Sequence, residues 1–192
     1  MYNNRPCTLV GCDGAQSNAI TSHRAAVVTR GLLLDIARAL GCPWLELDHE
    51  ITVAQIEHTL ERQRVEVRPG DALLIRTGNL ERARKNGGWD RLTHDDEPGI
   101  DLACLPWLHE HCIAAVAADT WAFEVLPNAS PIMLPVHAVG IVHMGLLLGE
   151  LFDLEALADA CSSDGQYDFL LTAAPLPFEG AVGAPVNPIA LR

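Results

Sequence analysis

The chain has 192 residues, a length typical of one domain, so we expect a single domain over residues 1–192. Hydrophobic residues make up 49% of the sequence and charged residues 20%, which excludes a wholly disordered chain. The formal net charge of −12 excludes nucleic acid as the main partner and also an anionic membrane surface, because both require a basic protein surface.

Apolar runs predict the main strands of the chain. Residues 1–26 show no clear apolar period and are poorly defined. A shorter run at 146–148 predicts a brief additional strand. Four longer runs have the continuous apolar character of strands that are buried on both faces, at 31–36, 72–76, 113–118 and 167–174.

Capping and spacing signals predict the helices. Thr52-Val53-Ala54-Gln55 matches a capping box and predicts the start of a charged amphipathic helix that continues to Arg64. Pro106 should kink or delay the helix expected over 101–111. The other expected segments are a polar, glycine-rich surface excursion over 79–100, a helical stretch over 137–144, a short helix over 154–161 and an extended or edge segment over 175–188.

Strands that alternate with helices predict an α/β fold with parallel strand pairing. Such sheets place their functional sites at the carboxyl ends of strands, where Arg76 and Asp119 stand. Trp121 and Glu124 follow Asp119 closely, and acids beside an indole can line a small-molecule pocket. We therefore treat these four residues as candidates for a substrate pocket, with a capped turn over the core as the alternative.

His137 and Glu150 lie in apolar surroundings. A carboxylate in such a run is costly to bury unless it is paired, protonated or bound to a metal. Histidine and glutamate are common ligands of divalent metals, so the pair is a candidate metal site. A core histidine with a buried or capping glutamate is the alternative. The nucleotide-binding, zincin and serine-hydrolase motifs are all absent from the sequence.

Several negative signals bear on the location of the protein. No apolar run approaches the roughly 18 residues that a membrane-spanning helix needs. The first residues, Met1 to Pro6, do not resemble a signal peptide. The six cysteines form no Cys-x-x-Cys pair, and we expect free thiols in a reducing compartment. The sequence thus predicts a cytoplasmic protein.

An ordered set of short segments resembles the cyclase family of metal-dependent hydrolases, which includes bacterial kynurenine formamidases and isatin hydrolases. Each segment is a weak signal, but the set covers most of residues 27–191 in the order of the family. The matching segments run from Val28 to Asp35, Pro69 to Gly78, Pro98 to Ile100, Ala118 to Glu124, Pro135 to His137, Gly149 to Glu150, Ala173 to Leu176 and Gly183 to Ala190.

The resemblance implies a swivelling β/β/α fold of mixed sheets with peripheral helices. It also implies hydrolysis of the C–N bond of an amide or formamide, as in N-formylkynurenine hydrolysis in tryptophan catabolism. One or two divalent ions, Zn²⁺ or Mn²⁺, would polarise the carbonyl and activate water. His137 and Glu150 match the later histidine and carboxylate ligands of the family. The implied partners are a small-molecule substrate and further copies of the chain, in a homodimer or homotetramer.

The family signature His-x-Gly-Thr-His-x-Asp, which supplies most metal ligands, does not occur in this sequence. We therefore expect a chain that lacks the N-terminal part of the family domain and has impaired activity, because a catalytic zinc usually has three protein ligands. A non-catalytic homologue that binds small molecules or serves as a scaffold is the alternative. A third hypothesis places a different site at Arg76, Asp119 and Glu124.

Overall fold

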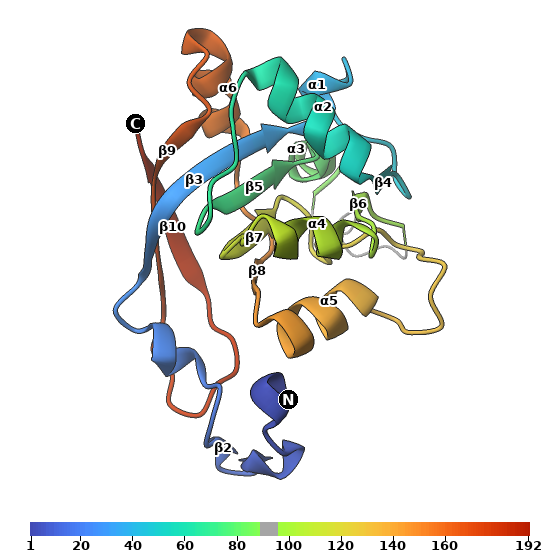
Figure 1. Cartoon of the computed structure of the whole chain (residues 1–192). Helices are drawn as coiled ribbons and strands as arrows, with labels where there is room; N and C mark the ends of the chain where they lie inside the picture. Colours follow the sequence, from blue (N-terminus) through green and yellow to red (C-terminus); the bar gives the residue numbers. More distant parts are fainter. Residues whose placement is uncertain (89–95) are drawn as a thin grey trace.

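A computed structural model describes residues 1–88 and 96–192 of the chain. Its centre is a six-stranded sheet with the order β10-β9-β3-β5-β7-β8 (Figure 1). The pairs β10–β9 and β9–β3 are antiparallel, whereas the remaining three pairs are parallel. The strands are β3 (Val27–Asp35), β5 (Ala72–Arg76), β7 (Ala115–Ala118), β8 (Leu147–Gly149), β9 (Asp168–Pro175) and β10 (Val186–Leu191).

All the expected strands belong to this mixed sheet, which confirms the α/β class. The strand expected at 31–36 differs in its bounds, because β3 begins at Val27 and ends at Asp35. The Asp35 side chain accepts a hydrogen bond from the backbone N–H of Arg38, 3.1 Å away, and so caps helix α1. Ile36 therefore begins a helix instead of ending a strand.

Six α-helices surround the sheet in the described part of the chain: α1 (Ile36–Ala39), α2 (Val53–Gln63), α3 (Asn79–Lys85), α4 (Cys104–Glu110), α5 (Pro135–Val139) and α6 (Glu155–Asp164). The expected capping box of α2 is present, since Thr52 and Gln55 exchange side-chain and backbone hydrogen bonds. Pro106 occupies the first turn of α4, where its missing N–H costs no helical hydrogen bond. The helix consequently starts later than residue 101.

Shorter elements complete the chain. Residues 1–26, where the sequence shows no clear pattern, form only such elements, and residues 14–20 lie beside the loop of the β9–β10 hairpin (Figure 1). A π-helical turn, η5 (Gly140–Met144), continues α5. The others are η1 (Tyr2–Asn4), η2 (Cys7–Leu9), η3 (Ile20–His23), β1 (Val10–Gly11), β2 (Gly14–Ala15), β4 (Glu50–Ile51) and β6 (Gly99–Ile100).

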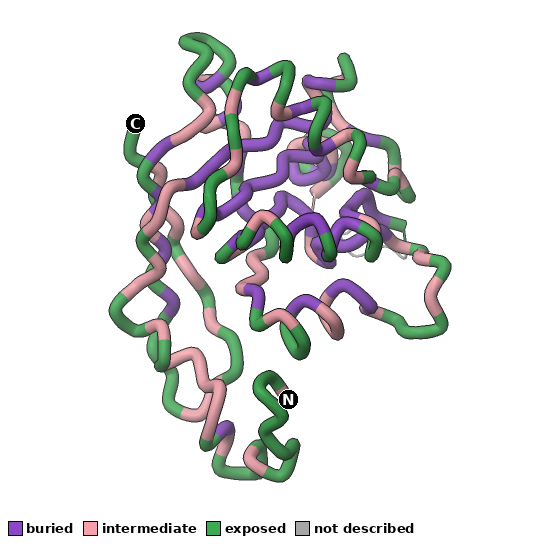
Figure 2. The backbone as a smooth tube through the Cα atoms, viewed as in Figure 1, coloured by how far each residue is buried: buried purple, intermediate pink, exposed green. Residues whose placement is uncertain are grey.

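The core has two layers, one on each face of the sheet, because successive strand residues point to opposite faces. On one face, Leu34 and its strand neighbours pack against α2 and α4 through residues such as Ile56 and Leu105. On the other face, Leu33 and its neighbours pack against α6 through Ala158. Figure 2 shows the buried backbone concentrated in the central strands and in the inner sides of these helices.

The prediction of a surface excursion over 79–100 is wrong for most of the residues in this range that the structure describes. Its first part is helix α3, in which Asn79 is 2% exposed. Its last part is buried, because Glu97 exchanges backbone hydrogen bonds with Leu126 and β6 pairs with β4. Polar composition indicated exposure, but these polar groups are satisfied inside the protein. Residues 89–95 of the excursion lie outside the described part.

None of the helices within residues 1–88 and 96–192 combines the length and apolar character that crossing a membrane requires.

Candidate functional site

Glu124, His137 and Glu150 form a connected cluster, although they come from three separate elements. Glu124 lies in the loop after β7, His137 in α5 and Glu150 directly after β8. The Nδ1 atom of His137 is 2.7 Å from Oε1 of Glu124. Its Nε2 atom is 3.2 Å from Oε1 of Glu150. The fold thus brings the two predicted metal ligands together and adds a buried carboxylate behind the histidine.

Glu124 fixes the position of His137 through the backbone as well as through the side chain. It is 1% exposed, and the backbone N–H groups of Val136 and His137 donate to its two oxygens at 3.0 Å. These N–H groups belong to the first turn of α5 and have no partner within the helix. Glu124 therefore caps α5 and at the same time orients the imidazole.

The two carboxylates raise the pKa of His137. The hydrogen bond that His137 donates to Glu124 is the largest cause and the one that it donates to Glu150 the next, while burial acts in the opposite direction. Together they move the pKa from 6.5 to about 9. In the metal-free protein the imidazole is therefore protonated at neutral pH and donates to both carboxylates.

This shift predicts a pH-dependent stability. The folded pKa of His137 is raised, so its contribution is complete below pH 6.5 and is lost as the pH rises through about 9. The contribution is about 3 kcal/mol, from 1.36 kcal/mol per pKa unit. We expect the difference in the free energy of unfolding between the wild type and His137→Gln to shrink by this amount between pH 6 and pH 10. Urea unfolding in the presence of a chelator measures it. A constant difference would contradict the prediction.

Arg76 lies in a buried ionic cluster. Its guanidinium donates to Asp35 at 2.8 Å and to both carboxylate oxygens of Glu155 at 2.8 and 2.9 Å. It also donates to the backbone carbonyl of Pro43 at 3.1 Å. These contacts connect β3, β5 and α6. None of these partners belongs to the His137 cluster.

Asp119 and Trp121 also lie at the carboxyl ends of the parallel strands. Asp119 is buried and accepts hydrogen bonds from Thr77 N, Thr77 Oγ1 and Gly78 N at 2.7–2.8 Å. Burial raises its pKa to about 6. Asp119 thus ties the end of β7 to the turn after β5. Trp121 is half-buried, and its backbone N–H donates to Glu97 at 2.9 Å.

Glu97 is the residue that sequence reasoning missed. It is fully buried and holds the turn that leads to Glu124. Burial raises its pKa to about 8. The only signal in the sequence is its place directly before Pro98-Gly99-Ile100, since its polar neighbours indicate an exposed loop.

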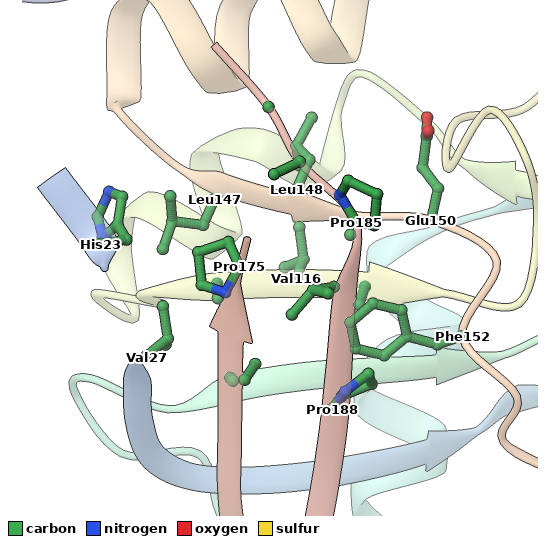
Figure 3. Close-up of a pocket in the computed structure, with 18 of the residues that line it drawn as sticks. His23, Val27, Val116, Leu147, Leu148, Glu150, Phe152, Pro175, Pro185 and Pro188 are labelled. Atoms are coloured by element: carbon green, nitrogen blue, oxygen red, sulfur yellow. The ribbon is translucent and has the colours of Figure 1, made fainter. Parts of the chain in front are cut away.

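A large open cavity, of about 860 Å³, adjoins Glu150. Figure 3 shows Glu150 and His23 on opposite sides of the view, with the apolar side chains of Leu147 and Leu148 between them. Its walls come from strands of the sheet and from the β9–β10 hairpin. Glu124 lines a second, smaller cavity of about 290 Å³. The cluster therefore borders two cavities, a spacious one at Glu150 and a smaller one at Glu124.

Comparisons with known proteins identify the family. The family model Cyclase matches residues 12–125, which is more than half of the chain. The chain belongs to the cyclase family. The crystal structure of a novel cyclase is 37% identical to this cyclase-family chain, with a TM-score of 0.91 over 100% of it. The chain spans 62% of the length of that protein.

More distant structures share the fold. Isatin hydrolase A from Labrenzia aggregata, bound to benzyl benzoate, is 20% identical with a TM-score of 0.68, and the match covers 95% of this chain and 70% of that one. Isatin hydrolase A from Ralstonia solanacearum is 20% identical with a TM-score of 0.65, covering 84% and 59%. None of the curated proteins matches this chain significantly. The swivelling β/β/α cyclase fold expected from the sequence is confirmed.

The donor atoms of this cyclase-family chain fit one side of a divalent metal shell. His137 Nε2 and the half-exposed carboxylate of Glu150 are suitable ligands for Zn²⁺ or Mn²⁺. Glu124 stands where metal-binding histidines usually have a carboxylate, on the other ring nitrogen. Within residues 1–88 and 96–192, no group of three or more His, Cys, Asp or Glu side chains is arranged to hold a metal ion. The described residues thus supply two protein ligands for a metal ion, His137 and Glu150.

Proposed function

We propose that this chain functions as a metal-dependent hydrolase that acts on the C–N bond of an amide or formamide in a small molecule. The observation that carries the proposal is the Glu124–His137–Glu150 arrangement, in which a buried carboxylate orients the histidine and a second carboxylate lies at its outer nitrogen. Membership of the cyclase family supports it. So does the fold shared with isatin hydrolases and with a potential metal-dependent hydrolase with cyclase activity, which is 18% identical with a TM-score of 0.57.

Each residue of the cluster has a defined part in this mechanism. Glu124 accepts the Nδ1 proton of His137 in a hydrogen bond, so the Nε2 lone pair faces Glu150 when the imidazole is neutral. Glu150 is 40% exposed at its side chain and is accessible to a ligand. A bound divalent ion would supply carbonyl polarisation and water activation. The apolar cavity beside Glu150 would hold the hydrophobic body of the substrate.

The finer identity is an arylformamidase-like enzyme that takes N-formylkynurenine or a similar aryl amide, with Zn²⁺ or Mn²⁺ as the metal. The aliphatic walls of the cavity suit an aromatic ring. We further propose that the chain alone has impaired activity, because two protein donors hold a catalytic ion weakly. A cytoplasmic location stays a prediction from the sequence.

Titration of the purified chain with Zn²⁺ and with Mn²⁺, followed by calorimetry, tests the metal site. We expect one weak site per chain that His137→Ala and Glu150→Ala abolish. Glu124→Ala should weaken it about 10–100-fold, the usual effect of removing the carboxylate behind a metal-binding histidine. The matched control is His58→Ala, which removes an exposed imidazole on α2. Binding that survives in His137→Ala, or that His58→Ala removes, would contradict the proposed site.

Hydrolysis of N-formylkynurenine and of isatin, followed by absorbance in the presence of the metal, tests the activity. We expect slow turnover that His137→Ala abolishes while the far-UV circular dichroism stays unchanged, because a ligand is removed and little core volume is lost. Turnover equal to that of the wild type in this variant would contradict the proposal.

A second candidate is a non-catalytic homologue that binds small molecules, and the size of the cavity favours it. Such a protein would bind an aryl amide or its hydrolysis product, as calorimetry can measure, without turning it over at any metal concentration. Binding without turnover would favour this candidate over the hydrolase.

We also propose that the chain forms a homodimer or homotetramer. The outer face of the β10–β9–β3 part of the sheet exposes Val28, Leu170, Ile189 and Leu191 by 46–60%. The strand register places Leu170 opposite Leu191, so these side chains share one face. Exposed apolar patches often mark contacts between proteins. A monomer in light scattering at tens of micromolar would contradict this proposal.

A further inference from the structure

Within residues 1–88 and 96–192, the groups that donate hydrogen bonds to the buried carboxylate of Glu97 are all uncharged. Its side chain accepts from Asn79 Nδ2 at 2.9 Å, from Trp121 N at 2.9 Å and from Ala122 N at 3.1 Å. Glu97 itself is 0% exposed. Burial is the main cause that raises its pKa, and the negative charge of Asp119 acts in the same direction. A buried acid of this kind is costly, and such groups are concentrated at functional sites.

The turn that Glu97 binds has an unusual backbone. Phe123, which directly follows Ala122, has φ = 60°, a left-handed conformation that bulky side chains rarely adopt. The backbone N–H of Glu124 donates to the carbonyl of Ala122 at 2.6 Å, which makes the turn tight. Such a conformation persists only where the surroundings determine it strongly. The carboxylate of Glu97 helps to hold the turn in this conformation, because it accepts hydrogen bonds from the N–H groups of Trp121 and Ala122 at the start of the turn.

The backbone of the same segment holds the other side of the turn. Glu97 and Leu126 exchange backbone hydrogen bonds of 2.8 and 2.9 Å. The N–H of Ile100 donates to the carbonyl of Phe123, and the N–H of Val125 to the carbonyl of Ile100, both at 3.3 Å. Residues 97–100 thus enclose the turn from Trp121 to Leu126, and Glu124 projects from it towards His137.

We propose that Glu97 is a positioning residue for the metal-binding histidine, acting through the turn at Trp121 and Ala122, which places the carboxylate of Glu124 against Nδ1 of His137. The effect of Glu97 on metal binding rests on the proposed function. The arrangement of Glu97, Glu124 and His137 is a property of the metal-free protein and does not depend on it. Glu97 contacts neither His137 nor Glu150 in the described hydrogen-bond network, and it acts only through Glu124.

Nuclear magnetic resonance of the metal-free chain tests the inference directly. The Nδ1 proton of His137, hydrogen-bonded to Glu124 at 2.7 Å, should give a separate downfield resonance that is protected from solvent exchange. We expect Glu97→Ala to abolish this resonance or move it upfield, and to weaken Zn²⁺ binding about 10–100-fold, as for loss of the oriented carboxylate itself.

A conservative variant separates positioning from packing. In Glu97→Gln, the amide oxygen can replace Oε1, which accepts from Asn79 and Trp121, but the amide NH₂ would face the N–H of Ala122. We therefore expect partial rescue, with a resonance between those of the wild type and Glu97→Ala. Asn79→Ala leaves the carboxylate and both backbone donors in place, and should change the resonance least. These two variants keep the test decisive if Glu97→Ala fails to fold.

Asp71→Ala is the matched control. Asp71 is an equally buried carboxylate that accepts from Arg68 N and pairs with Arg30, directly before β5 and away from the turn. We expect it to lower stability and to leave the His137 resonance unchanged. An unchanged resonance in both Glu97 variants, or an equal loss in Asp71→Ala, would overturn the inference. Failure of hydrolysis alone would count against the proposed function, because the resonance is measured without metal or substrate.

Discussion

Arg76→Ala is expected to lower the free energy of unfolding by about 3–5 kcal/mol, the usual cost of breaking a buried ion pair. The side chains of Arg76 and Asp35 are 4% and 2% exposed, and they are 2.8 Å apart. Removal of the guanidinium leaves the buried Asp35 carboxylate with the more distant Arg38, at 3.4 Å, as its remaining ion-pair partner in the described part of the chain. Glu155, which is 22% exposed, loses the same partner. Urea unfolding at pH 7 measures the loss.

Arg84→Ala is the matched control for this experiment. Arg84 and Asp153 are also 2.8 Å apart, but their side chains are 49% and 55% exposed. An exposed pair contributes about 0–1 kcal/mol, so the control should stay within that range. Equal losses in the two variants would contradict the burial argument. If Arg76 also contacts substrate, as the sequence predicts, a folded Arg76→Lys variant should show a raised KM, whereas a purely structural role predicts an unchanged KM.

Gly99→Ala is expected to lower the free energy of unfolding by about 3 kcal/mol, at the upper end for inserting atoms into a packed core. An added Cβ would lie 2.3 Å from the carbonyl carbon of Glu124, 2.5 Å from the carbonyl oxygen of Phe123 and 2.6 Å from the N atom of Val125. All three are backbone atoms, so no side chain can rotate away. The turn that carries Glu124 would have to move, and Zn²⁺ binding should weaken with stability.

Gly183→Ala serves as the control, because an added Cβ there would meet nothing within 4 Å. Its effect on unfolding should lie within about 0.5 kcal/mol, as for most surface substitutions. Thermal and urea unfolding of the two variants give the comparison. A Gly99→Ala protein as stable as Gly183→Ala would show that residues 97–100 do not hold the turn.

Much of the fold could be predicted from the sequence because the relevant signals are local. The apolar run at 72–76 coincides with β5, since continuous burial on both faces needs no knowledge of the neighbouring strands. The capping box at Thr52 is likewise a contact between residues three apart. His137 and Glu150 stood out because a charged group in an apolar run must be satisfied, whatever the fold.

Other features were decided only by tertiary structure. The sequence predicts parallel pairing, but β9 and β10 pair antiparallel with the sheet, because strand direction depends on how a distant hairpin returns to β3.

The part that Glu124 plays was also hidden in the sequence. Its carboxylate oxygens accept hydrogen bonds from Val136 and His137, which lie twelve and thirteen residues later in the chain. Glu97 accepts a hydrogen bond from Trp121 in the same turn, which lies twenty-four residues later in the chain. Sequence by itself determined which groups are costly to bury, because that cost belongs to each residue and its immediate neighbours. Only the tertiary structure decided which partners satisfy them, because hydrogen bonds between distant segments leave no periodic pattern in the chain.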